Sequence, residues 1–157
     1  MNDAAIRLIT IEDYDAVLDL WRQSGEVSLN DIDDSRDGMA RYLERNPRTS
    51  FAAEIGGAPV GTVMCGHDGR SGYIFHACVA RGYQREGVGA RLVEAALAAL
   101  KAEGITHATL HVLKGNKPGA AFWRKQGFAP FSALEYHSKD LVPLVWYDPD
   151  YPPEESQ

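Results

Sequence analysis

The chain has 157 residues, a formal net charge of −6 at neutral pH, 45% hydrophobic residues and 24% charged residues. This length suits a single domain with its own hydrophobic core, since most domains run to ~50–200 residues. The acidic balance argues against general nucleic-acid binding, which requires a basic surface. The sequence has no apolar span of ~20 residues and no secretory signal pattern, so no membrane partner is expected. Cys65 and Cys78 lie in apolar, strand-like segments, as reduced core cysteines of a cytoplasmic protein do.

The hydrophobic pattern switches between strand and helix periods along the chain. Thr10 is expected to cap the first helix, with Asp13 in a capping-box position. Gly56-Gly57 predicts a hairpin between two strands. In chain order we expect strand 5–10, helix 11–23, loop 25–34, helix 36–45, strands 50–55, 60–66 and 73–79, a helix to about residue 103, strand 106–113, helix 118–126 and strand 132–141. These elements predict one α+β domain, residues 1–142, around a mixed sheet. A proline-rich acidic tail, residues 143–157, follows and is expected to be mobile at its end.

The segment Gln84-Arg85-Glu86-Gly87-Val88-Gly89-Ala90 is the most informative stretch of the sequence. It follows the apolar run 73–79 and opens a long amphipathic helical pattern. A strand, a glycine-bearing turn and a helix N-terminus can cradle a pyrophosphate, because free N–H groups and the positive end of the helix dipole converge on the anion. The turn lies mid-chain, after an antiparallel meander, and lacks Gly-Lys-Ser/Thr. Neither a Rossmann dinucleotide site nor a P-loop fits it.

Two segments together resemble the GCN5-related N-acetyltransferases, the GNAT family. Residues 79–89, Val-Ala-Arg-Gly-Tyr-Gln-Arg-Glu-Gly-Val-Gly, are similar to the family's acetyl-CoA-binding motif, Arg/Gln-x-x-Gly-x-Gly/Ala. Residues 116–128, Asn-Lys-Pro-Gly-Ala-Ala-Phe-Trp-Arg-Lys-Gln-Gly-Phe, are similar to its later motif, an Asn followed by a short helix that ends in Lys-x-Gly-Phe. The resemblance covers residues 5–141. It implies a mostly antiparallel mixed sheet flanked by helices, with a V-shaped splay between the two central strands.

The resemblance also implies a site for acetyl-CoA as acyl donor, without a metal. Pantetheine would lie in the splay like an added strand, and the N–H groups of the glycine turn would hold the pyrophosphate. An amine would attack the thioester directly, and an N–H near Val79 would stabilise the oxyanion. The cofactor-binding residues implied in this way are Cys78, Val79, Gln84, Arg85, Glu86, Gly87, Val88, Gly89, Ala90, Asn116, Phe122 and Trp123.

One departure from the family pattern concerns the group that protonates the leaving thiolate. Trp123 stands where the family often has a Tyr, and an indole N–H is no practical proton donor. Trp123 is therefore favoured as a packing wall for the cofactor. The thiolate would then leave unprotonated, or another group would serve, for which Tyr136, Tyr83 and His111 are the candidates.

A second departure concerns the general base, because the strand 73–79 carries no carboxylate, where many family members keep a Glu. His76 is the candidate base in this strand, since an attacking ammonium must first lose its proton. The competing interpretation makes His76 a hydrogen-bonded core histidine that shares its strand face with Ile74 and Cys78.

The acceptor site falls, by the same resemblance, on the acidic stretch 30–34. Asn30, Asp31 and their neighbours could hold a cationic amine, or could form a solvated loop and helix cap. Trp21 could line the acceptor pocket or pack in the core. The predicted function is acetyl-CoA-dependent N-acetylation of a primary amine on a small molecule, peptide or protein, and exposed strand edges favour a homodimer. A non-catalytic acyl-CoA-binding or sensing module is the alternative, which Trp123 and the missing carboxylate keep open.

Overall fold

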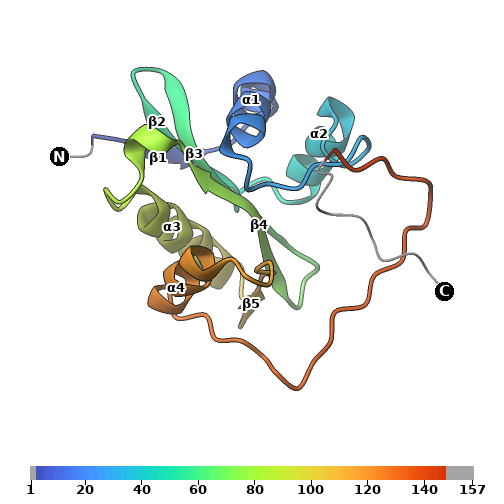
Figure 1. Cartoon of the computed structure of the whole chain (residues 1–157). Helices are drawn as coiled ribbons and strands as arrows, with labels where there is room; N and C mark the ends of the chain where they lie inside the picture. Colours follow the sequence, from blue (N-terminus) through green and yellow to red (C-terminus); the bar gives the residue numbers. More distant parts are fainter. Residues whose placement is uncertain (1–2, 148–157) are drawn as a thin grey trace.

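The computed structural model describes residues 3–147, and the end of the predicted tail, residues 148–157, lies outside this range. Figure 1 shows helices on both sides of a twisted sheet. The elements are β1 (Ala5–Leu8), the 3-10 turn η1 (Ile11–Asp13), α1 (Tyr14–Ser24), α2 (Arg36–Arg45), β2 (Phe51–Ile55), β3 (Ala58–His67), β4 (Gly72–Val79), the 3-10 turn η2 (Arg81–Tyr83), α3 (Val88–Ala102), β5 (Ala108–Thr109) and α4 (Lys117–Lys125).

The described strands form one sheet in the order β1-β2-β3-β4-β5. The pairs β1–β2, β2–β3 and β3–β4 are antiparallel, whereas β4 and β5 run parallel. Figure 1 places α1 and α2 on one side of the sheet and α3 and α4 on the other. Each side has its own buried apolar layer, one containing Trp21 and Met64 and the other containing Leu92 and Ile74. The predicted mixed, mostly antiparallel sheet flanked by helices is therefore confirmed.

Local signals begin and end the helices near the predicted positions. The Asp13 carboxylate accepts a hydrogen bond from the Thr10 N–H at 2.9 Å, as the capping box predicts. Ser35 caps α2 by accepting from the Gly38 N–H at 3.0 Å. Gly25 ends α1 in the left-handed conformation, with φ 66°. Helix α3 buries one apolar stripe against the sheet, formed by Val88, Leu92, Val93, Ala96 and Leu100.

The strand β4 loses its partner β5 soon after it begins. The two strands pair only through Gly72 with Ala108 and Tyr73 with Thr109. The expected strand 106–113 is thus reduced to Ala108–Thr109, and the segment that follows β5 leaves the sheet. Within residues 3–147, β4 from Ile74 onward has β3 on one side and no strand on the other. This is the predicted splay, although β5 lies at the edge of the described sheet rather than at its centre.

The prediction of a strand over residues 132–141 is wrong. This stretch has no regular structure, and its apolar side chains are exposed, with Leu134 at 71% and Tyr136 at 67%. A strand needs a neighbouring strand for its backbone N–H and C=O groups. Because β5 ends at Thr109, the sheet offers residues 132–141 no edge of matching length.

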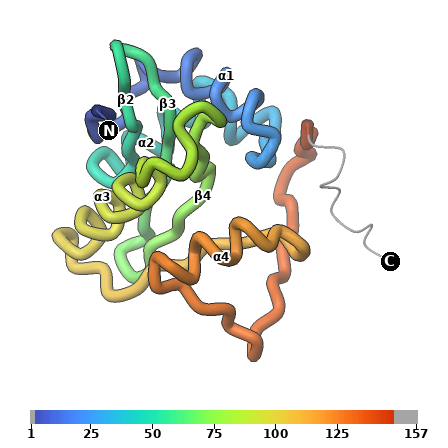
Figure 2. Tube along the Cα trace, turned by 60° about the vertical axis from the view of Figure 1, so that its left-hand side comes forward, coloured from blue at the N-terminus to red at the C-terminus, as the bar shows by residue number. Residues whose placement is uncertain are grey.

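The segment after α4 crosses to the other side of the molecule, from α4 to the α1–α2 side (Figures 1 and 2). There the Asp31 N–H donates to the Val145 carbonyl at 3.0 Å, and the Tyr147 N–H donates to the Leu29 carbonyl at 3.0 Å. Asn30 and Trp146 form an isolated antiparallel bridge. Residues 145–147, which the sequence placed in the tail, are thus attached to the loop between α1 and α2. None of the helices within residues 3–147 is long and apolar enough to cross a membrane.

Candidate active site

A cleft of about 2170 Å³ opens between the loop 25–34, β4, the start of α3 and helix α4. Its lining brings together most of the residues that the sequence singled out. The predicted residues that line it are Trp21, Asn30, His76, Cys78, Val79, Tyr83, Gln84, Arg85, Gly87, Gly89, Ala90, His111, Asn116, Phe122, Trp123 and Tyr136. The other predicted residues, Asp31, Glu86 and Val88, lie outside this lining. Val88 is 1% exposed and belongs to the core under α3.

The glycine turn that leads into α3 forms one end of the cleft. Arg85 and Gly87 both adopt left-handed backbone conformations, with φ 63° and 82°. Turns of this kind direct successive N–H groups toward one point, and the first turn of a helix has N–H groups without an intrahelical acceptor. The N–H groups of Val88, Gly89 and Ala90 belong to that first turn. This geometry, with the helix dipole behind it, suits an anionic group.

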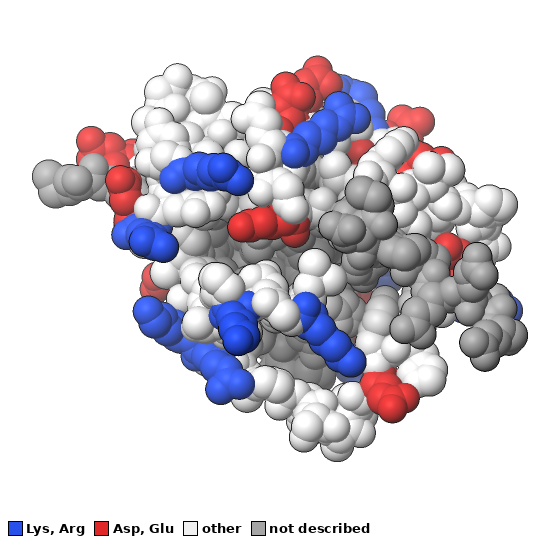
Figure 3. All heavy atoms as spheres, in the orientation of Figure 1, with Lys and Arg blue, Asp and Glu red and all other residues white. Residues whose placement is uncertain are grey.

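Positive charge gathers around this end of the cleft. Figure 3 shows Lys and Arg side chains over the lower left of the molecule, where Figure 1 places α3 and α4. The turn and the start of α3 contribute Arg81, Arg85 and Arg91, and α4 contributes Lys117, Arg124 and Lys125. The net charge of −6 is therefore not spread evenly, and an anion would meet a locally basic surface.

Helix α4 forms the opposite wall of the cleft and approaches α3 closely. A side chain at Gly89 would place its Cβ 3.2 Å from the Phe122 ring, so only glycine fits here without displacing the ring. Asn116 caps α4 by accepting from the Gly119 N–H at 3.0 Å. Trp123 is half-buried and meets Phe128 edge-to-face, with ring centroids 5.4 Å apart. The α4 wall of the cleft is thus aromatic, and position 123 lacks the hydroxyl that a Tyr would place there.

The strand β4 contains a bulge at His76. Thr62 pairs with Cys78 and Met64 pairs with Phe75, so that two residues of β4 oppose a single residue of β3. His76 has φ 47°, a left-handed conformation that non-glycine residues seldom adopt. The expectation that Ile74, His76 and Cys78 share one face is therefore wrong. Ile74 packs in the layer under α3, whereas Cys78 packs in the layer under α1.

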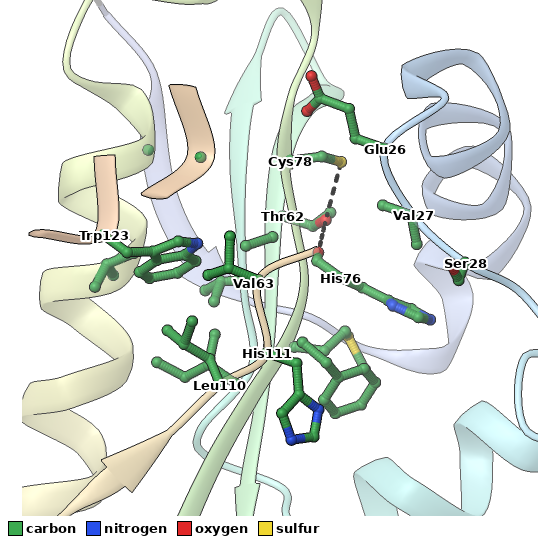
Figure 4. A pocket seen from close by; sticks show the side chains of 18 of the residues that line it. Glu26, Val27, Ser28, Thr62, Val63, His76, Cys78, Leu110, His111 and Trp123 are labelled. Atoms are coloured by element: carbon green, nitrogen blue, oxygen red, sulfur yellow. Dashed lines mark hydrogen bonds between the residues drawn. The ribbon is translucent and has the colours of Figure 1, made fainter. Parts of the chain in front are cut away.

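Buried hydrogen bonds hold this bulge in place (Figure 4). The Thr62 hydroxyl donates to the His76 carbonyl at 3.0 Å and accepts from the Trp21 indole N–H at 2.9 Å. Thr62 is 1% exposed and Trp21 is 2% exposed, so both bonds are shielded from water. Trp21, which the sequence offered either as pocket lining or as core, packs in the core and touches the cleft through this network.

The imidazole of His76 is paired with a carboxylate that the sequence did not single out by itself. His76 Nε2 lies 2.6 Å from Asp34 Oδ1, and the two side chains are only 12% and 10% exposed. The second Asp34 oxygen accepts from the Asn30 N–H at 2.7 Å. The rings of Trp21 and Phe75 meet the imidazole edge-to-face, with centroids 4.7 and 4.8 Å away. The His76 ring is thus held by the Asp34 carboxylate and by the two aromatic rings.

A second histidine lies where the chain leaves β5. His111 Nδ1 is 2.8 Å from the Tyr73 hydroxyl, and its ring centroid is 4.2 Å from that of Tyr136. Burial lowers the pKa of His111, because the charged imidazolium is less well solvated there. Burial also raises the pKa of the Cys78 thiol to about 11, so this cysteine is a protonated wall residue rather than a nucleophile.

The predicted acceptor residues of the loop brace the loop itself. The Asn30 side-chain oxygen accepts from the N–H groups of Ile32 and Asp33, at 3.1 and 2.7 Å. Asp31 Oδ1 accepts from the Val145 N–H at 2.7 Å. Of the acidic stretch, Asp33 and Asp34 line the cleft in addition to Asn30. Among residues 3–147, no group of three or more His, Cys, Asp or Glu side chains is arranged to hold a metal ion.

The open mixed sheet, with a fourth strand that splays away beside a helix-opening glycine turn, is the architecture that the two sequence motifs predict. Residues 14–128 match the model described as the Acetyltransferase (GNAT) family. The chain therefore belongs to the GNAT acetyltransferase family, as the two sequence motifs predict.

Individual relatives agree with this assignment. The acetyltransferase ECA0875 of Pectobacterium atrosepticum is 27% identical over 139 residues, which cover 88% of this chain and 92% of the relative. The structure of Ard1 from Thermoplasma volcanium is similar with a TM-score of 0.71 and 20% identity, over 80% of this chain and 82% of that one. The PaiA N-acetyltransferase from Thermoplasma acidophilum, solved in complex with coenzyme A, gives a TM-score of 0.69 and 17% identity, over 92% and 97% of the two chains.

Proposed function

We propose that this chain is an N-acetyltransferase that transfers the acetyl group of acetyl-CoA directly to a primary amine. The observation that carries the proposal is the course of β4. Within the described residues its edge beyond Tyr73 has no strand beside it on the β5 side, and the strand leads directly into the glycine turn. An extended pantetheine arm and a pyrophosphate need these two features in this order. The similar fold of the PaiA enzyme, which is solved with coenzyme A, supports the same ligand.

The residues present fit acetyl-CoA. The N–H groups of the turn 84–90 and the Arg85 guanidinium suit the pyrophosphate. Gly89 packs closely against Phe122 where α3 meets α4, and we assign the part of the cleft beside this contact as the slot for the pantetheine arm. Asn116, Phe122 and Trp123 line the α4 side of the slot, and the backbone of Cys78 and Val79 lines the β4 side. The donor supplies an acetyl thioester, which is activated toward amines.

The chain's own residues supply the proton chemistry. An acceptor amine with a pKa of ~10 arrives as an ammonium ion and must lose a proton before it attacks. His76 is the base that we assign to this step, because it lines the cleft beside the acceptor loop. The N–H near Val79 donates to the carbonyl oxygen as negative charge develops on it. Tyr136 is the candidate proton donor to the leaving thiolate. Trp123 is assigned as a packing wall for the cofactor.

A non-catalytic acyl-CoA-binding module is the second candidate, and one feature favours it. Trp123 carries no hydroxyl, and Tyr136 is 67% exposed on a segment without regular structure. A binding module needs the pyrophosphate turn and the slot but no proton donor. The two candidates therefore share the cofactor site and differ in turnover.

The test combines calorimetry with a thiol-release assay. Acetyl-CoA and CoA are titrated into the protein, and CoA thiol release is then followed with small primary amines, polyamines, amino acids and peptides. Binding with acceptor-dependent release supports the transferase. Binding without release on any acceptor supports the sensing module, and failure to bind CoA would sink both.

A further inference from the structure

We infer that Asp34 is a positioning residue for His76, and that the two side chains form a dyad that presents Nδ1 of the imidazole as the proton acceptor. The inference rests on the proposed function, because it concerns the base of that same reaction. It adds a residue from the loop between α1 and α2, 42 positions away along the chain, to the chemistry of β4.

The first argument is the unusual backbone of His76. A left-handed non-glycine residue inside a strand is strained and persists only where surrounding contacts impose it. Here the Thr62 hydroxyl binds the His76 carbonyl, and the Trp21 indole binds the same hydroxyl. The bulge moves His76 off the regular alternation of β4. Its ring then lies on the side of the sheet where the loop 25–34 carries Asp34.

The second argument is the hydrogen bond itself. A carboxylate can only accept, so His76 Nε2, 2.6 Å from Asp34 Oδ1, must carry a proton. The other nitrogen of the neutral ring, Nδ1, is then left with its lone pair, which is the form that a general base requires. Asp34 is itself fixed, because its second oxygen accepts from the Asn30 N–H at 2.7 Å. The rings of Trp21 and Phe75 prevent the imidazole from turning over.

The third argument is the direction of the side chain. In Figure 4 His76 extends from β4 toward Ser28, while Trp123 lies on the opposite side of the strand. His76 therefore faces the part of the cleft that the loop 25–34 lines. The other charged groups of the loop 25–34 and of α2 that line the cleft are Glu26, Asp33, Arg41, Glu44 and Arg45, and Asp33 pairs with Arg41 at 3.7 Å.

A purely structural role is the natural alternative, in which the pair simply fastens the loop to the sheet. The chain offers a matched comparison for that role. His67 Nε2 lies 3.3 Å from Glu103 Oε2, outside the cleft lining, where it connects the end of β3 to the residue after α3. Glu103→Gln therefore removes a carboxylate from a His–carboxylate pair that has no place in the reaction.

The experiment compares wild type, Asp34→Asn, His76→Gln and Glu103→Gln with an acceptor found in the thiol-release panel. Asp34→Asn is expected to lower kcat ~10²-fold, as His76→Gln does, while the Kd for CoA changes less than ~2-fold. Glu103→Gln should retain kcat within ~2-fold. A kcat of Asp34→Asn within ~3-fold of wild type would overturn the dyad, and so would a lower rate that is fully restored by a higher acceptor concentration.

Imidazole ¹⁵N NMR tests the tautomer that the dyad requires, while the split between kcat and the dependence on acceptor concentration separates the dyad from a purely structural role. Neutral His76 in wild type should be the Nε2–H tautomer, and Asp34→Asn should populate the Nδ1–H form. An Nδ1–H tautomer in wild type refutes the inference even where Asp34→Asn does not fold. The proposed function fails separately: wild type that binds CoA but acetylates no amine removes the reaction and the dyad with it, whereas active wild type with an equally active Asp34→Asn removes the dyad alone.

Discussion

The buried hydroxyl of Thr62 supports a quantitative prediction about stability. Thr62→Val replaces the hydroxyl with a methyl group of similar size and leaves the buried Trp21 N–H without its acceptor. It also removes the donor to the His76 carbonyl. An unsatisfied buried donor costs about 1–3 kcal/mol, and the lost bond to the carbonyl adds about 0.5–1.5 kcal/mol. We expect the free energy of unfolding to fall by about 3 kcal/mol.

Urea denaturation followed by tryptophan fluorescence measures this loss, and a thermal melt checks it independently. For a domain of this size each kcal/mol moves Tm by about 2–4 °C, so Thr62→Val should melt about 6–12 °C lower. Thr62→Ser keeps the hydroxyl and should recover most of the hydrogen-bonding contribution. Because Thr62→Val also removes the hydrogen bond that holds the His76 backbone, kcat of this variant should fall as well.

Thr49→Val is the matched comparison, since Thr49 is fully buried and its hydroxyl donates a single bond, to the Cys65 carbonyl at 2.6 Å. That carbonyl also accepts from Ser50, so the substitution leaves it partly satisfied. Thr62→Val should cost at least about 1 kcal/mol more than Thr49→Val. Equal losses, or a Thr62→Ser variant as unstable as Thr62→Val, would refute the network around Trp21.

Two further predictions follow from the close packing of the cleft and the burial of the thiols. Gly89→Ala should change the free energy of unfolding by less than about 1 kcal/mol, because the gain in helix propensity offsets the displacement of the Phe122 ring, yet it should weaken CoA binding about 10-fold in calorimetry. Gly82→Ala, where a Cβ would meet open space, should leave binding unchanged, and equal binding by the two variants would contradict the assigned slot. Burial raises the pKa of the Cys78 thiol to about 11 and that of Cys65 to about 12, so alkylation of the native protein at pH 8 should be over about 100-fold slower than after unfolding in urea. Since both thiols are neutral in the folded state, their contribution to stability is complete below pH ~9, the ordinary thiol value, and is lost as the pH rises toward 11 and 12. Rapid labelling of the native protein at pH 8 would contradict their burial.

Much of the fold could be predicted because the signals are local. The apolar stripe from Val88 to Leu100 fixes the buried face of α3, and the Thr10–Asp13 pair marks the beginning of a helical segment within four residues. The glycine turn is also a local signal. Its glycines permit the backbone conformation that the turn needs, and all of them lie within a few residues of one another.

The failed predictions depend on partners that are distant along the chain. The sequence predicts a strand at residues 132–141, but β5 stops at Thr109 and offers no matching edge. The face of the sheet on which each β4 side chain lies could not be predicted either. A bulge at His76 reverses the alternation, and no residue type between Tyr73 and Val79 indicates a bulge. A histidine at the centre of an aromatic and aliphatic strand was the only available signal, and it left the base and core interpretations open.

The two halves of the site therefore differ in how they are encoded. In the proposed site the pyrophosphate is held by backbone N–H groups, which the local glycine spacing of residues 84–90 can present, and the motif at 116–128 narrows the predicted cofactor to CoA. The proposed acceptor side depends on side chains that are distant in the sequence, because the bulge brings His76 to Asp34 and Thr62 binds the His76 carbonyl. A substitution in the loop 25–34 can alter the acceptor or the base without touching the cofactor motifs. For this reason family membership defines the acyl donor more narrowly than the amine, and the amine must be sought through the contacts of His76 and Asp34.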